Sequence, residues 1–186
     1  GNNGRTLNGR TLANGGTAVF QDGFLTAFNG ALIHNLAGAV WEFQGDDFLY
    51  TNTGGATFQN DGTLDKVAGD GMMTIHPAFI NGGSVHVEAG ALEFRGNFTQ
   101  TSTGTLYVQI SGLTPITDFN RYIIAGNAIL DGTLDVTLIN GFVPNPGDSF
   151  EVLTFAALTG QFATVNGHGQ GYTVNYNPTN VTLIAQ

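Results

Sequence analysis

Apolar and polar residues alternate over several short stretches of the chain. In residues 84–88 (SVHVE) the two valines occupy every second position, with polar residues between them. Residues 106–110 (LYVQI) and 134–138 (LDVTL) repeat this pattern. A period of two places successive side chains on opposite faces of a β-strand. These stretches therefore predict strands with one buried face and one solvated face.

A recurring phrase separates the strands, in which Asn precedes Gly, a small residue and then Leu or Val. It occurs at residues 14–19, 35–40, 60–64 and 81–85, and in weaker form, without Asn, at 104–106 and 132–134. The glycines at positions 16, 38, 62, 83, 104 and 132 are 22, 24, 21, 21 and 28 residues apart. Such a period is too short for two helices and their turns, but it fits one coil of a β-solenoid with three short strands.

The residue types of this phrase suit a sharp corner between strands. Gly and Asn tolerate the left-handed backbone conformation that such a corner requires. The Leu or Val that follows is expected to begin a strand with its side chain pointing inward. Asn at the same corner of successive coils is expected to form a hydrogen-bonded ladder along the stack.

We therefore predict an all-β protein, a parallel β-helix with coils of about 21–25 residues and a β-rich C-terminal cap. Residues 1–110 are assigned to β-helix coils. The rhythm changes from residue 111, with loops at 112–115 and 141–148 and further strands at 122–124, 150–155, 172–176 and 181–184. Residues 111–186 are interpreted as the final coils and the cap of one continuous body, because an uncovered coil end exposes strand edges.

Composition supports this fold class and excludes some partners. Hydrophobic residues make up 41% of the chain and charged residues only 10%, which is too apolar for disorder and too poor in Lys and Arg for exposed helices. The net charge is −9. The cations are scattered, so no nucleic-acid partner is expected. No stretch approaches 18 apolar residues, so no membrane insertion is expected either.

Two stretches, residues 58–101 and 130–154, resemble the β-helical passenger regions of autotransporter-like and related bacterial surface proteins. The resemblance covers most of the chain from about residue 28. It implies a parallel β-helix and an extracellular or cell-surface location. It also implies a role as an adhesin or surface fibre, because most such proteins are large exported adhesins or fibres.

Parallel β-helices also include polysaccharide lyases and hydrolases, which need converging carboxylates, and in lyases Ca²⁺ with an Arg or Lys base. The candidate pairs are Asp46 with Asp47, in a predicted turn, and Asp131 with Asp135, on the repeat. Neither pair has a cation nearby in sequence. We therefore expect no enzyme, no catalytic residues and no cofactor. Calcium bound by surface Asp residues and a lyase or hydrolase remain as less favoured alternatives.

The four histidines, His34, His76, His86 and His168, lack the spacing of metal ligands and are expected to be separate surface imidazoles. Aromatic residues offer an alternative function, since they suit a sugar-stacking platform. The candidates are Trp41, Tyr50, Tyr107, Tyr122, Tyr172 and Tyr176. Trp41 follows Val40, which is expected to point inward, so Trp41 is predicted to point outward. It is the candidate glycan contact of an adhesin or carbohydrate-binding module.

The first residues already resemble part of a coil, since Arg-Thr-Leu occurs twice within residues 4–12. An uncapped coil presents strand edges to which another chain can add. The expected self-assembly ends are Arg5, Leu7, Arg10 and Leu12 at one end and Val181 and Leu183 at the other. Contact between unlike ends generates fibres. The favoured hypothesis is therefore an extracellular structural protein, a β-solenoid subunit that assembles head to tail with itself into a surface filament, with a glycan or host surface as the alternative partner.

Overall fold

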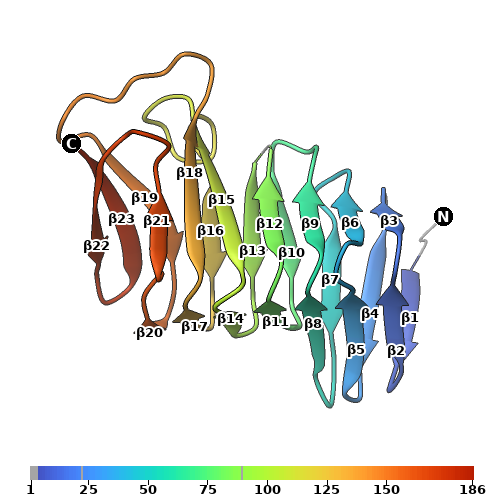
Figure 1. The fold of residues 1–186 in the computed structure, drawn as a ribbon. Coiled ribbons are helices and arrows are strands. Elements are labelled where there is room, and N and C mark those ends of the chain that lie inside the picture. The colour runs from blue at the N-terminus through green and yellow to red at the C-terminus, as the bar shows by residue number, and fades with distance from the viewer. Residues whose placement is uncertain (1–3, 22, 89) are drawn as a thin grey trace.

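The chain winds into a row of successive coils built from β-strands (Figure 1). A computed structural model describes residues 4–21, 23–88 and 90–186, and all the elements in these residues are β-strands. Each coil contributes one strand to each of three sheets. The N-terminal coil lies at one end of the stack and the C-terminal strands at the other. No helix in the described residues has the length and apolar character needed to cross a membrane.

The three sheets run along the stack, and each takes every third strand of the chain. The first sheet contains β1 (Gly4–Asn8), β4 (Phe24–Phe28), β7 (Phe48–Thr51), β10 (Met72–Ile75), β13 (Ala91–Phe94), β16 (Arg121–Ile124), β19 (Ser149–Thr154), β23 (Asn180–Ala185) and β22 (Tyr172–Tyr176). The second contains β2 (Thr11–Asn14), β5 (Ala31–Asn35), β8 (Ala56–Asn60), β11 (Ala78–Asn81), β14 (Phe98–Gln100), β17 (Asn127–Leu130) and β20 (Ala157–Gly160). The third contains β3 (Thr17–Phe20), β6 (Val40–Phe43), β9 (Thr63–Lys66), β12 (Ser84–Val87), β15 (Thr105–Ile110), β18 (Thr133–Leu138) and β21 (Thr164–Asn166).

Neighbouring strands are parallel throughout the seven coils, which confirms the predicted parallel β-helix. The register of the third sheet gives the length of each coil. It aligns Thr17, Val40, Thr63, Ser84, Thr105, Thr133 and Thr164. Successive steps are 23, 23, 21, 21, 28 and 31 residues. The last two coils are longer because loops 111–120 and 139–148 leave the stack where a third-sheet strand leads into a first-sheet strand (Figure 1).

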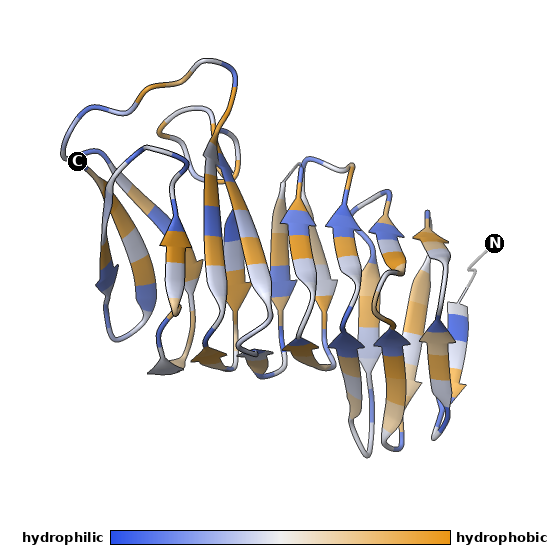
Figure 2. Cartoon of the chain, in the orientation of Figure 1, coloured by the Kyte–Doolittle hydropathy of each residue, from blue (hydrophilic) through white to orange (hydrophobic). Residues whose placement is uncertain are grey.

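Inward side chains form continuous rows, one residue per coil. Figure 2 shows the corresponding alternation of hydrophobic and hydrophilic bands along the strands. In the second sheet Ile33, Phe58, Phe79 and Phe98 are aligned and fully buried. The ring centroids of Phe79 lie 5.2 Å from Phe58 and 5.9 Å from Phe98. Each buried phenylalanine contributes roughly 1.5–3 kcal/mol, so this row is a main source of stability.

An asparagine ladder runs beside this row, as predicted. The side-chain amide of Asn14 donates to Asn35 (2.9 Å), Asn35 to Asn60 (2.8 Å) and Asn60 to Asn81 (2.9 Å). Asn81 donates in turn to Gln100 at 3.2 Å. Each of the four asparagines also donates to a main-chain carbonyl at the start of the third-sheet strand in the next coil. The ladder therefore links five successive coils along this edge, from Asn14 to Gln100.

Gly38 has the expected left-handed backbone, with φ of 79°, but four of the other recurring glycines meet a second constraint. Among Gly62, Gly83, Gly104 and Gly132, only Gly132 has a positive φ, of 64°. A Cβ on any of the four would lie 2.0–2.5 Å from a main-chain oxygen of the neighbouring coil. Glycine is therefore required at this corner because the backbones of successive coils approach too closely for a side chain.

The C-terminal end carries the predicted β-rich cap. Strand β23 pairs antiparallel with both β19 and β22, so the last two strands extend the first sheet at its C-terminal end. Phe162 packs near Tyr176, with ring centroids 6.4 Å apart, and the Tyr176 hydroxyl accepts a hydrogen bond from the Phe162 amide. Val181 and Leu183 are fully buried in this cap. They are core residues of the same chain, so the expectation that they form an exposed assembly end is wrong.

Candidate functional site

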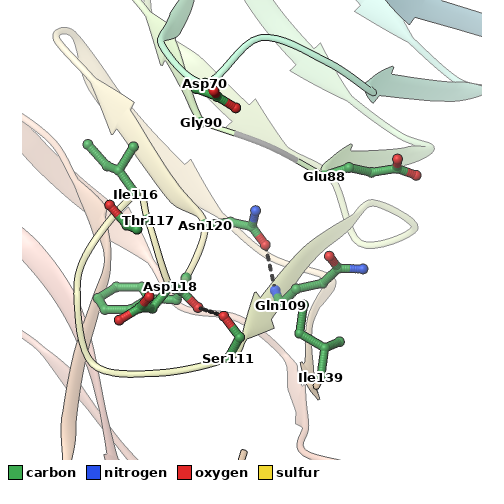
Figure 3. Close-up of a pocket in the computed structure, with 11 residues that line it drawn as sticks. Asp70, Glu88, Gly90, Gln109, Ser111, Ile116, Thr117, Asp118, Asn120 and Ile139 are labelled. Atoms are coloured by element: carbon green, nitrogen blue, oxygen red, sulfur yellow. Dashed lines mark hydrogen bonds between the residues drawn. The ribbon is translucent and has the colours of Figure 1, made fainter. Parts of the chain in front are cut away.

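A cleft of about 360 Å³ lies where loop 111–120 passes over the corners of the preceding coils (Figure 3). Asp70 comes from the turn between β9 and β10, Glu88 directly follows β12, and Gln109 belongs to β15. The loop contributes Asp118 and Asn120 to the same cleft. The lining is therefore mostly polar and carries three carboxylates.

Hydrogen bonds hold the loop side of the cleft in place. The side-chain oxygen of Asn120 accepts a hydrogen bond from the backbone N–H of Gln109 at 2.6 Å. The Ser111 hydroxyl donates to the backbone carbonyl of Asp118 at 2.9 Å. The Asp118 carboxylate accepts the backbone N–H of Thr114 at 2.9 Å. This bond stabilises the ionised carboxyl and lowers the pKa of Asp118.

The free groups of the cleft decide what it can do chemically. Among the described residues, the carboxylates of Asp70 and Glu88 have no hydrogen-bond partner, and both side chains are exposed. The described part of the chain contains no group of three or more His, Cys, Asp or Glu placed to hold a metal ion. The arrangement can therefore accept hydrogen bonds from a neutral or cationic polar ligand, and its negative charge opposes an anionic one.

A second polar surface follows the outer face of the third sheet. Glu42, Asp65 and His86 are aligned on successive strands, and His86 stacks on Tyr107 with ring centroids 3.9 Å apart. Burial raises the pKa of Asp65, and His86 opposes this shift. Glu88 and Glu42 raise the pKa further by charge repulsion. The ionised form of Asp65 is therefore less favourable in the folded protein than in the unfolded chain.

Replacing Asp65 with Asn is expected to raise the free energy of unfolding at pH 7. The native pKa of Asp65 is raised, so the cost of its charge is fully present above that pKa. The cost falls as the pH is lowered through it, and disappears below the unfolded value of about 3.9. Urea denaturation at pH 7 and at about pH 3 should show a gain that is lost in acid. Asp118→Asn is the control and should lower the free energy of unfolding at pH 7, because the pKa of Asp118 is lowered in the folded protein. An equal gain in stability for Asp65→Asn at both pH values would contradict the prediction.

The carboxylate pairs singled out from the sequence serve structural roles. Asp46 pairs with the amino group of Lys66 at 3.0 Å and accepts the Gly71 amide at 3.0 Å. Asp131 accepts the amide of Gly132 at 2.7 Å, within its own turn. These contacts tie corners of the coils together and do not bring the two pairs into one site.

Asp135 and the histidines are also distributed over separate places. Asp135 pairs with His168 at 2.7 Å, and His34 pairs with Asp61 at 2.7 Å on the second sheet. His76 follows β10 on the first sheet, and His86 belongs to β12 on the third. The histidines therefore lie apart from one another, as their spacing predicts.

The predicted outward orientation of Trp41 is wrong. Trp41 is only 3% exposed and packs edge-on against Phe58, with ring centroids 5.2 Å apart. The register aligns Trp41 with Leu64, and Val40 with Thr63. The inward position therefore falls one residue later than the repeat phrase suggested, and Trp41 is not a surface contact for a glycan.

The N-terminal assembly residues lie at an open coil end. Arg5, Arg10 and Leu12 are exposed, Leu12 by 40%, and Leu7 packs partly against the core. An apolar hollow of about 260 Å³ opens here, and its lining includes Arg5, Leu12, Ala18, Phe20, Leu25 and Trp41. The guanidinium of Arg5 lies 5.9 Å from the centre of the Phe20 ring. This end of the stack therefore differs from the covered C-terminal end.

Sequence patterns missed two features of these surfaces. Lys66 occupies an inward position and is fully buried, with its amino group donating to the carbonyl of Ala68 at 3.0 Å. The alternation of the strand could have indicated this, because Asp65 points outward and the next residue, Lys66, therefore points inward. The cleft was missed because its two sides are distant in sequence and meet only through the coil register.

Comparison with known proteins adds no family assignment. No protein-family model matches the chain, and no curated protein matches it. The resemblance to autotransporter-like surface proteins therefore stays a prediction from the residues.

Proposed function

We propose that this chain is an extracellular structural protein, a β-solenoid rod that assembles end to end with further copies of itself at the cell surface. The observation that carries the proposal is that no described strand pairs with the outer side of the first described coil. Strands β1, β2 and β3 are the terminal strands of their three sheets. Their outer edges therefore have backbone groups that no other described strand pairs with, and such edges are templates for strand addition.

The apolar interior at this end favours the same conclusion. Leu12 continues the inward row of Ile33 and Phe58, yet it is 40% exposed. A coil stacked on this end would cover Leu12 and the adjacent hollow, at about 25 cal/mol for each Å² of apolar surface removed from water. The side-chain oxygen of Asn14 accepts one bond, from the Gly16 amide, and an amide oxygen can accept a second. An incoming coil could extend the ladder there.

The C-terminal end offers matching edges, although its interior is covered. Strand β20 is the last strand of the second sheet and β21 the last of the third. In the proposed junction, β2 and β3 of one copy add to β20 and β21 of the next. Leu158 and Val165, which pack partly buried against the core, lie on these two strands. The contact joins unlike ends, so it repeats along an axis and produces a filament.

Leu12→Asp is expected to abolish assembly, because it places a charge in the apolar contact of the junction. Sedimentation velocity over a range of concentrations should show growing species for the unmodified chain and only monomer for the variant. Leu113→Asp is the matched control, since Leu113 is 53% exposed in loop 111–120. Electron microscopy of the assembled material should show filaments. The proposal would be wrong if the unmodified chain stayed monomeric at all concentrations, or if the two variants assembled to the same extent.

A further inference from the structure

A group of aromatic rings gathers on the outer face of the first sheet, from three successive coils. Phe24 comes from β4, Phe48 and Tyr50 from β7, and His76 follows β10. The rings of Phe48 and Tyr50 are nearly parallel, at 7°, with centroids 5.5 Å apart. Tyr50 also meets Phe24 at 5.9 Å and His76 at 5.0 Å. These four residues are called the aromatic platform below.

The platform lies outside the core. Leu25, Leu49 and Ile75, which alternate with its residues, point inward and are at most 5% exposed. Phe48 is 40% exposed, and Met72 on the outer face of β10 is 39% exposed. Exposed apolar side chains gathered on one face mark an interaction surface more often than single ones do.

The polar tips of the platform are unused within the chain. The Tyr50 hydroxyl and the His76 imidazole have no hydrogen-bond partner among the described residues. Burial, and then the charge of Arg95, lower the pKa of His76, which favours the neutral form of its ring. Arg95 itself pairs with Glu93 at 2.9 Å. The charge of Arg95 is therefore balanced by Glu93, and the platform presents hydrogen-bonding groups at the edges of apolar rings.

We propose that the aromatic platform binds a neutral polysaccharide. A saccharide ring has an apolar C–H face and hydroxyl groups at its edge, so it can stack on these rings and pair with both polar tips. A purely apolar partner would leave the Tyr50 hydroxyl and the His76 imidazole desolvated and unpaired. Strands in a sheet are about 4.8 Å apart, so the platform extends along the stack and suits a chain-like ligand.

Affinity electrophoresis tests this inference with the full chain. Gels should contain soluble neutral glucans, mannans or galactans, and polygalacturonate as the acidic probe. At least one neutral polymer should retard the protein, and polygalacturonate should not. Tyr50→Ala should weaken the apparent affinity by about tenfold, the loss expected for one aromatic contact. Phe48→Ser should act in the same direction and provides a second variant should Tyr50→Ala fold poorly.

Two matched controls separate this site from the rest of the molecule. Tyr107→Ala removes an outward tyrosine from the third sheet and should leave binding unchanged. Leu12→Asp should abolish assembly and leave polysaccharide binding intact, so failure of one proposal does not decide the other. Three results would overturn the inference. The first is no retardation by any neutral polymer, and the second is an equal loss of affinity in Tyr50→Ala and Tyr107→Ala. The third is that Tyr50 supports association with lipid vesicles or with other copies of the chain, and not with a polysaccharide.

Discussion

Asn60→Ala is expected to lower the free energy of unfolding by about 4 kcal/mol, because it interrupts the asparagine ladder at its fully buried centre. Asn60 accepts from Asn35 and donates to Asn81 and to the Ser84 carbonyl. Truncation leaves partners on both neighbouring coils unpaired, and a buried unpaired group costs about 1–3 kcal/mol. Urea denaturation followed by circular dichroism measures the loss.

Asn14→Ala is the matched control for this prediction. It removes the same side chain from the same ladder, but at the open end, where Asn14 is only partly buried. Water can replace the lost bonds there, so the expected loss is about 1 kcal/mol. Equal losses at positions 14 and 60 would show that the ladder does not act as a buried network.

Gly83→Ala is expected to cost at least about 3 kcal/mol, since it forces a Cβ into the backbone of the neighbouring coil. The added carbon would lie 2.0 Å from the Gly62 carbonyl oxygen and 2.7 Å from the Asp61 carbonyl carbon. Relief of this contact has to move the strand, which breaks the 2.8 Å hydrogen bond from the Ser84 amide to the Gly62 oxygen. The same denaturation experiment measures the effect.

Gly16→Ala tests whether this cost comes from close approach of the coils. Gly16 occupies the same phrase in the first coil, but no described atom lies within 4 Å of its added Cβ and its φ is not positive. The variant should therefore be neutral or slightly stabilising. A comparable loss at both positions would assign the effect to backbone conformation instead.

The periodic part of the fold could be predicted because each coil repeats the same physical constraints. Asn35, Asn60 and Asn81 recur where the ladder needs them, and the alternation in residues 84–87 matches the observed burial. The prediction failed where a corner departs from the phrase. Gly38, with φ of 79°, lies one residue before the position aligned with Gly62, and this offset reversed the expected orientation of Trp41.

The candidate surfaces depend on the register in which strands pair, so they were harder to predict from the sequence. Phe24 and Phe48 are far apart along the chain, and they become neighbours only because β4 pairs with β7 in one register. A shift of one strand by one residue would turn its phenylalanine toward the core and separate the two rings. Loops 111–120 and 139–148 follow no repeat, so the cleft beside the first of them has no periodic signature.

The difference between the two ends of the rod predicts the order in which its coils unfold. Every coil in the middle has two described neighbours, whereas the first described coil has one. In a linear array with nearest-neighbour coupling, stability is therefore lowest at an unprotected terminus and rises inward. An isolated rod should fray from Thr6 and Leu12 toward the capped strands, and a copy stacked on the first coil would arrest that unravelling.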